Sequence, residues 1–69
     1  MLVLRKGKKV HGEFKTVDAL CESDALAALV PAGRIAEVCR FLDRNAFTLA
    51  IYGARARLGG GVMVEQIRG

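Results

Sequence analysis

The sequence predicts one small α+β domain in which a β-hairpin at each end of the chain flanks two or three short helices. Three observations lead to this prediction. Apolar and polar residues alternate near both ends, the middle has a helical period, and glycine or proline separates the segments. A chain of 69 residues allows a single domain over residues 1–69, and its apolar share of 52% is ample for a core.

The first hairpin is expected over residues 2–14. Residues 2–4 form a short apolar strand, and residues 6–9 supply a turn in which Gly7 can take a positive φ. Residues 10–14 return as the second strand, with Val10, Gly12 and Phe14 on one face and His11 and Glu13 on the other.

Two helix starts and one helix stop follow in the sequence. Thr16 or Asp18 is suited to begin a first helix, and Ser23 to cap a second one. Pro31 ends the second helix because it disfavours helical backbone at the residue before it. Proline is also favoured at the first position of a new helix, so another helix is expected to start there.

Residues 34–44 decide the fold class. Read as a helix, they place one apolar stripe opposite a charged one, and Asn45 closes the helix. The apolar stripe consists of Ile35, Val38, Cys39 and Leu42. A strand over residues 34–42, which would give a ββαβββ order, is the alternative, but it would place charges on both faces of the strand.

The last third of the chain predicts the second hairpin. Phe47, Leu49 and Ile51 alternate with other residues, as in a strand whose one face is buried. Three consecutive glycines at 59–61 form the turn, and residues 62–67 form the returning strand.

The residues needed for catalysis or metal binding are scarce. The chain has one serine and one histidine, and Ser23 is better explained as a helix cap than as a nucleophile beside His11. Zinc sites need about four ligands, more than one histidine with Cys21 and Cys39 provides. The two cysteines are expected to be buried thiols, with a disulfide between two helices as the alternative. Neither an enzyme activity nor a cofactor or metal is therefore expected.

No stretch of the sequence approaches the ~18 apolar residues of a membrane span. At the start of the chain the apolar run precedes the charges, whereas a signal peptide has its charges first. The sequence therefore predicts an unprocessed cytoplasmic protein that does not enter a membrane.

The formal net charge of +4 favours a polyanion as partner. The basic residues fall in two regions, before and after an acidic segment over residues 16–31. The candidate nucleic-acid contacts are Lys6, Lys8, Lys9, Arg34, Arg40, Arg44, Arg55 and Arg57. The predicted function is a small DNA-binding regulator of the phage or plasmid type. The alternative is a protein-binding module that inhibits or recruits a larger protein.

A homodimer is also expected, joined partly through the last hairpin. If residues 47–56 formed one strand, its second face would carry few charges, and one helical layer cannot cover both faces of a sheet. The candidate residues for the dimer or partner interface are Ala50, Tyr52, Met63 and Ile67.

Overall fold

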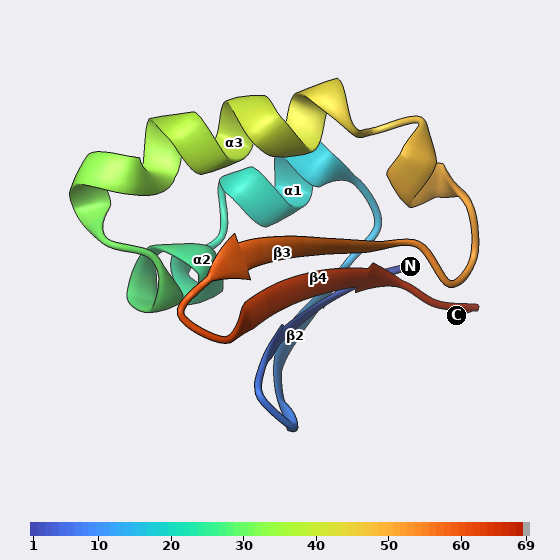
Figure 1. The fold of residues 1–69 in the computed structure, drawn as a ribbon, viewed down its shortest axis with the longest axis horizontal. Helices are drawn as coiled ribbons and strands as arrows, with labels where there is room; N and C mark the ends of the chain where they lie inside the picture. Colours follow the sequence, from blue (N-terminus) through green and yellow to red (C-terminus); the bar gives the residue numbers. More distant parts are fainter. Residues whose placement is uncertain (69) are drawn as a thin grey trace.

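In the computed structural model, which describes residues 1–68, short helices cover one face of a four-stranded antiparallel sheet (Figure 1). The strands are β1 (Leu2–Lys6), β2 (Lys9–Phe14), β3 (Arg55–Gly59) and β4 (Val62–Gln66). The helices are α1 (Val17–Cys21), α2 (Asp24–Leu29) and α3 (Ile35–Arg44), with 3₁₀ turns η1 (Ala32–Arg34) and η2 (Thr48–Ala50). The spatial order of the strands is β2-β1-β4-β3. This confirms the predicted α+β fold with a hairpin at each end.

Both predicted helix caps are formed. The Thr16 hydroxyl accepts a hydrogen bond from the Ala19 N–H at 3.1 Å and starts α1. The Ser23 hydroxyl accepts one from the Leu26 N–H at 3.2 Å and starts α2. Each cap satisfies a backbone donor that the first helical turn leaves unpaired.

Residues 35–44 are helical, so the alternative of a strand over residues 34–42 is wrong. Val38 and Leu42 are buried, and the other two members of the apolar stripe are partly buried against the same core. The Asn45 side-chain amide donates to the Phe41 carbonyl at 2.8 Å and closes the helix, as predicted. Phe41 itself lies at the margin of the stripe and is 42% exposed.

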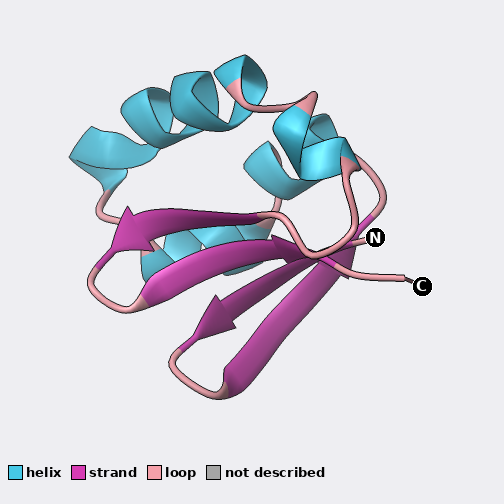
Figure 2. Cartoon of the chain, turned by 45° about the vertical axis from the view of Figure 1, so that its right-hand side comes forward, coloured by secondary structure: helices cyan, strands magenta, loops and turns pink. Residues whose placement is uncertain are grey.

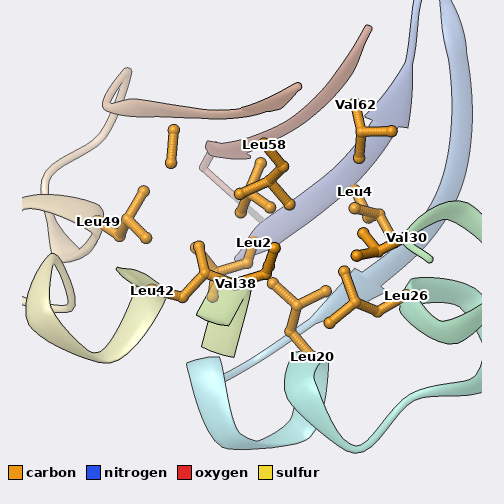
Figure 3. Packing of buried hydrophobic residues seen from close by; sticks show 12 residues of the cluster. Leu2, Leu4, Leu20, Leu26, Val30, Val38, Leu42, Leu49, Leu58 and Val62 are labelled. Carbon is orange, nitrogen blue, oxygen red and sulfur yellow. The ribbon is translucent and has the colours of Figure 1, made fainter. Parts of the chain in front are cut away.

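The core lies between the helices and the covered face of the sheet (Figure 3). Leu4 of β1 and Val64 of β4 are fully buried at its centre. Leu20, Leu26 and Leu42, one from each helix, are also fully buried. Every α-helix thus contributes at least one leucine to a single core, which is why three such short helices are stable together.

A β-bulge changes which face of β2 its first residues occupy. Leu4 is opposite Gly12, but Arg5 is opposite Val10, so one residue of β2 is unpaired between them. Because Val10 shares a face with Arg5, it points away from the helices and is 47% exposed. The prediction that Val10 shares a face with Gly12 and Phe14 is therefore wrong, since an extra residue shifts the alternation.

The predicted strand over residues 47–52 is not formed. These residues make the 3₁₀ turn η2 and a loop, and Leu49 alone among them is buried. Residues 47–52 do not pair with β4, because residues 55–59 occupy the edge of β4 that β1 leaves free. Leu49 instead packs into the core at the end of α3.

Leu42→Ala is expected to lower the free energy of unfolding by about 2–5 kcal/mol, because it leaves a cavity in the core. Phe41→Ala should cost less than Leu42→Ala, since Phe41 is partly in solvent. Arg40→Ala, on the exposed face of α3, should stay within about 0.5 kcal/mol of the parent protein. Urea denaturation of the three variants measures this order. Equal losses for Leu42→Ala and Arg40→Ala would contradict the placement of α3.

Candidate nucleic-acid interface

The turns of the two hairpins lie side by side at one end of the molecule. The Gly7 N–H donates to the Gly61 carbonyl at 3.1 Å, which joins the β1–β2 turn to the β3–β4 turn. Both turns lie at the end away from the chain termini (Figure 2). Gly60 and Gly61 have φ values of 61° and 81°, which two-residue hairpin turns of this kind require at both central positions.

Five cationic residues surround these turns, and we call them the basic pole. They are Lys6, Lys8, Lys9, Arg34 and Arg57. Arg34, directly before α3, reaches the second turn. Its Nη1 atom lies so close to Gly59 that a Cβ atom added to this glycine would be 3.4 Å from Nη1. Lys6 and Arg34 line one hollow together with Gly59, and Arg57 shares a neighbouring hollow with Arg34.

The charges of the basic pole are largely uncompensated. Arg34 alone has a carboxylate nearby, at 3.7 Å from Glu37, and both side chains are exposed. Such a pair is weak in water. Within residues 1–68, no carboxylate oxygen lies within 4.0 Å of the charged nitrogens of the other four residues. The pole therefore presents a positive potential at which a polyanion would be attracted.

Two further predicted contacts, Arg40 and Arg44, extend along the outer face of α3. They line a shallow hollow with Glu37 and Phe41. Because a helix rises 1.5 Å per residue, Arg34 and Arg44 are separated by roughly 15 Å along the axis. Arg40 and Arg44 thus lie on the helix that follows Arg34, but outside the basic pole.

The predicted contact Arg55 is engaged elsewhere. Its Nε donates to Glu65 Oε2 at 3.0 Å on the face of the sheet that no helix covers. Arg5 of β1 lies 3.8 Å from the other oxygen of the same carboxylate, and the Glu65 side chain is only 12% exposed. Sequence reasoning did not find this cluster, because nothing in the sequence indicates that β1 pairs with β4.

The predicted dimer surface on the sheet is wrong in its premise. The strand β3 begins only at Arg55. Within it Ala56 is buried beneath the helices, and Arg55 and Arg57 face outward. The uncovered face therefore carries the charged residues Arg5, Arg55, Arg57 and Glu65 as well as the apolar residues Val3 and Met63.

The four candidate interface residues do not form one surface. Met63 lies on the uncovered face, opposite Arg5 and Arg57. Tyr52 and Ile67 lie at the opposite end from the basic pole, where the Gly53 N–H bonds to Gln66 and the Ile67 N–H to Met1. Ala50 is also there, in η2 (Figure 1).

Of the exposed apolar side chains at this end, the sequence predicted Tyr52 as an interface residue but not Phe47 or Ile51. Phe47 is 92% exposed, Ile51 64% and Tyr52 59%. The Arg68 guanidinium lies 5.2 Å from the centre of the Tyr52 ring. The signal available in the sequence is the absence of any charged residue over 45–54. The alternation of Phe47, Leu49 and Ile51 in this segment instead predicts a strand.

The cysteines are free thiols, partly buried on α1 and α3. Burial and the adjacent Cys39 thiol raise the pKa of Cys21 from 9.0 to about 12. Within the part of the chain that the structure describes, no group of three or more potential metal ligands is brought together.

Comparison with protein-family models, with curated proteins and with solved structures gave no match to this chain. Across residues 1–68, none of the helices has the length and apolar character needed to cross a bilayer. The interpretation of the interface therefore rests on its geometry and charge.

The raised pKa predicts that native Cys21 reacts slowly with iodoacetamide, because the thiolate is the nucleophile. Peptide mass mapping should show faster alkylation at the same pH once urea unfolds the protein. As pH rises from 9.0 towards 12, the unfolded thiol loses a proton that the folded one retains, so stability should fall across this window. In Cys21→Ala the free energy of unfolding should decrease less over the same pH range. Equal alkylation rates in the native and unfolded protein would contradict the raised pKa.

Proposed function

We propose that the protein is a small non-enzymatic regulator that binds duplex DNA through the basic pole. The observation that carries this proposal is the gathering of five cations from three separate segments, four of them without a carboxylate partner within residues 1–68. Uncompensated cations at a surface are the electrostatic feature that phosphate backbones bind most generally.

The composition of the pole is suited to phosphate. Arg34 and Arg57 offer planar guanidinium groups that can hold two phosphate oxygens at once, whereas Lys6, Lys8 and Lys9 act as mobile point charges. Phosphate contacts of this kind orient a protein on DNA without reading its sequence. Any base contact is then expected from Arg34, which directly precedes α3, and from the arginines of α3 itself.

The position of the exposed aromatic residues favours a duplex over a single strand. Proteins that bind single strands place aromatic rings among their cations, so that bases stack on them. Here the two most exposed aromatic side chains, Phe47 and Tyr52, belong to the segment that Gln66 holds at the opposite end from the basic pole. Phe41, which is 42% exposed, lines a hollow with Arg34 and Arg57, but one ring can stack only one base.

The second candidate function is a protein-binding module that inhibits or recruits a larger protein. The observation that favours it is the exposed apolar group of Phe47, Ile51 and Tyr52, which DNA binding does not use. We propose that the DNA-binding protein is a homodimer, because two copies would offer two basic poles to one polyanion. A cytoplasmic location agrees with either function.

Binding to a random duplex should weaken steeply as salt rises. If all five residues of the pole contact phosphates, the slope of log K against log salt concentration should be about −4.5. Lys8→Ala/Lys9→Ala should reduce this slope by about 2, because two phosphate contacts are lost. Gel retardation or fluorescence anisotropy over a salt series measures it.

Lys15→Ala/Arg68→Ala is the matched control, since it removes the same charge away from the pole. The control should keep the parent slope. The absence of any retardation at low salt, or equal slopes for both double variants, would contradict DNA binding by the pole.

A further inference from the structure

Residues 45–54, which we call the apolar loop, expose apolar side chains in a segment without charge. The loop joins α3 to β3 and lies at the end of the molecule away from the basic pole (Figure 1). Phe47, Ile51 and Tyr52 point into solvent. None of them contributes to the core, so folding of the single chain does not explain why they are apolar.

The apolar loop is held in place by the rest of the fold. The Leu49 N–H donates to the Asn45 carbonyl at 2.9 Å, and Leu49 itself is buried in the core. Gln66 fixes the other side: its side chain donates to the Leu49 carbonyl at 2.7 Å, and its carbonyl accepts from the Gly53 N–H at 2.8 Å. Because the backbone is already ordered, a partner would lose little binding energy in ordering it.

The exposed surface has the size of an interface centre. Given the 150–250 Å² that an aromatic side chain can bury, the three side chains together expose roughly 400 Å². The largest apolar patch of a monomer is typically about 300–600 Å² and often functional. A standard interface buries about 800 Å² per partner. The three side chains therefore supply about half of one side of such an interface.

A hollow of about 350 Å³ adjoins the apolar loop. Ala46, Leu49 and Ala50 of the apolar loop line it, and its other lining residues include Asp18 and Asp43. The exposed Phe47 thus directly follows Ala46 of a recess whose lining is partly apolar and partly charged, with Lys15, Asp18 and Asp43. A twofold contact would set the loop of each copy against the recess of the other.

We propose that a second copy of this chain docks on the apolar loop through a twofold contact between the two loops. Charge favours this occupant. In a protein of net charge +4, residues 45–54 carry no charge of their own and can face a second copy of the loop without repulsion. The margin carries both signs, with Asp43 near the recess and Arg68 over Tyr52. The contact leaves both basic poles free. This inference rests on the homodimer in the proposed function, but not on DNA binding.

Light scattering on a size-exclusion column, at concentrations from micromolar to millimolar, tests the proposal. The parent protein is expected to approach twice the chain mass of 7.4 kDa as its concentration rises. Phe47→Asp and Ile51→Asp should each weaken dimerisation at least tenfold, because each buries a charge at the centre of the contact. Val10→Asp is the matched control, an exposed apolar residue on β2, and should dimerise like the parent.

Two further readouts distinguish loss of the contact between the loops from unfolding of the variant. Tyr52 is the only tyrosine and the chain has no tryptophan, so tyrosine emission should change on dilution of the parent but not of Phe47→Asp. Circular dichroism should show the parent fold in Phe47→Asp, since the replaced side chain is 92% exposed. A one-chain mass at every concentration, or undiminished dimerisation of both loop variants, would overturn the proposal. Retardation of DNA by monomeric Phe47→Asp would show that the two proposals stand separately.

Discussion

The antiparallel pairing of β1 with β4 is the constraint on which the rest of the structure depends. It joins Leu2–Lys6 to Val62–Gln66, the first and last strands of the chain, and makes them the centre of the sheet. An isolated two-stranded hairpin is marginal in water. Here the pairing makes one four-stranded sheet from two hairpins, and it places Leu4 and Val64 side by side beneath the helices.

The same pairing divides the surface into two ends of different character. Because the two central strands are antiparallel and each adjoins its own hairpin turn, both turns emerge at one end, where Gly7 meets Gly61. The lysines of the first turn thereby join Arg34 and Arg57 in the basic pole. The apolar loop lies at the other end, beside Gln66. A polyanion and a second copy of the chain would therefore occupy different surfaces and would not compete.

Local signals in the sequence were sufficient for the helices and both turns. Caps at Thr16 and Ser23, and the stripe through Val38 and Leu42, follow from short-range periodicity and hydrogen bonding. Features that depend on long-range pairing were not predictable in this way. The bulge that turns Val10 outward depends on the register of β2 with β1. The start of the third strand at Arg55, rather than at residue 47, depends on the register of β3 with β4. The candidate contacts stay a prediction, and their division between the pole, α3 and the Glu65 cluster could not be foreseen without the β1–β4 pairing.

Nuclear magnetic resonance on the ¹⁵N-labelled protein, titrated with a short random-sequence DNA duplex at low salt, tests the central claim most directly. Because the β1–β4 pairing makes one surface of the two turns, the amides of residues 6–9, of Arg34 and of residues 57–61 should shift together with a single dissociation constant. Shifts confined to one turn, or centred on residues 47–52, would contradict the account.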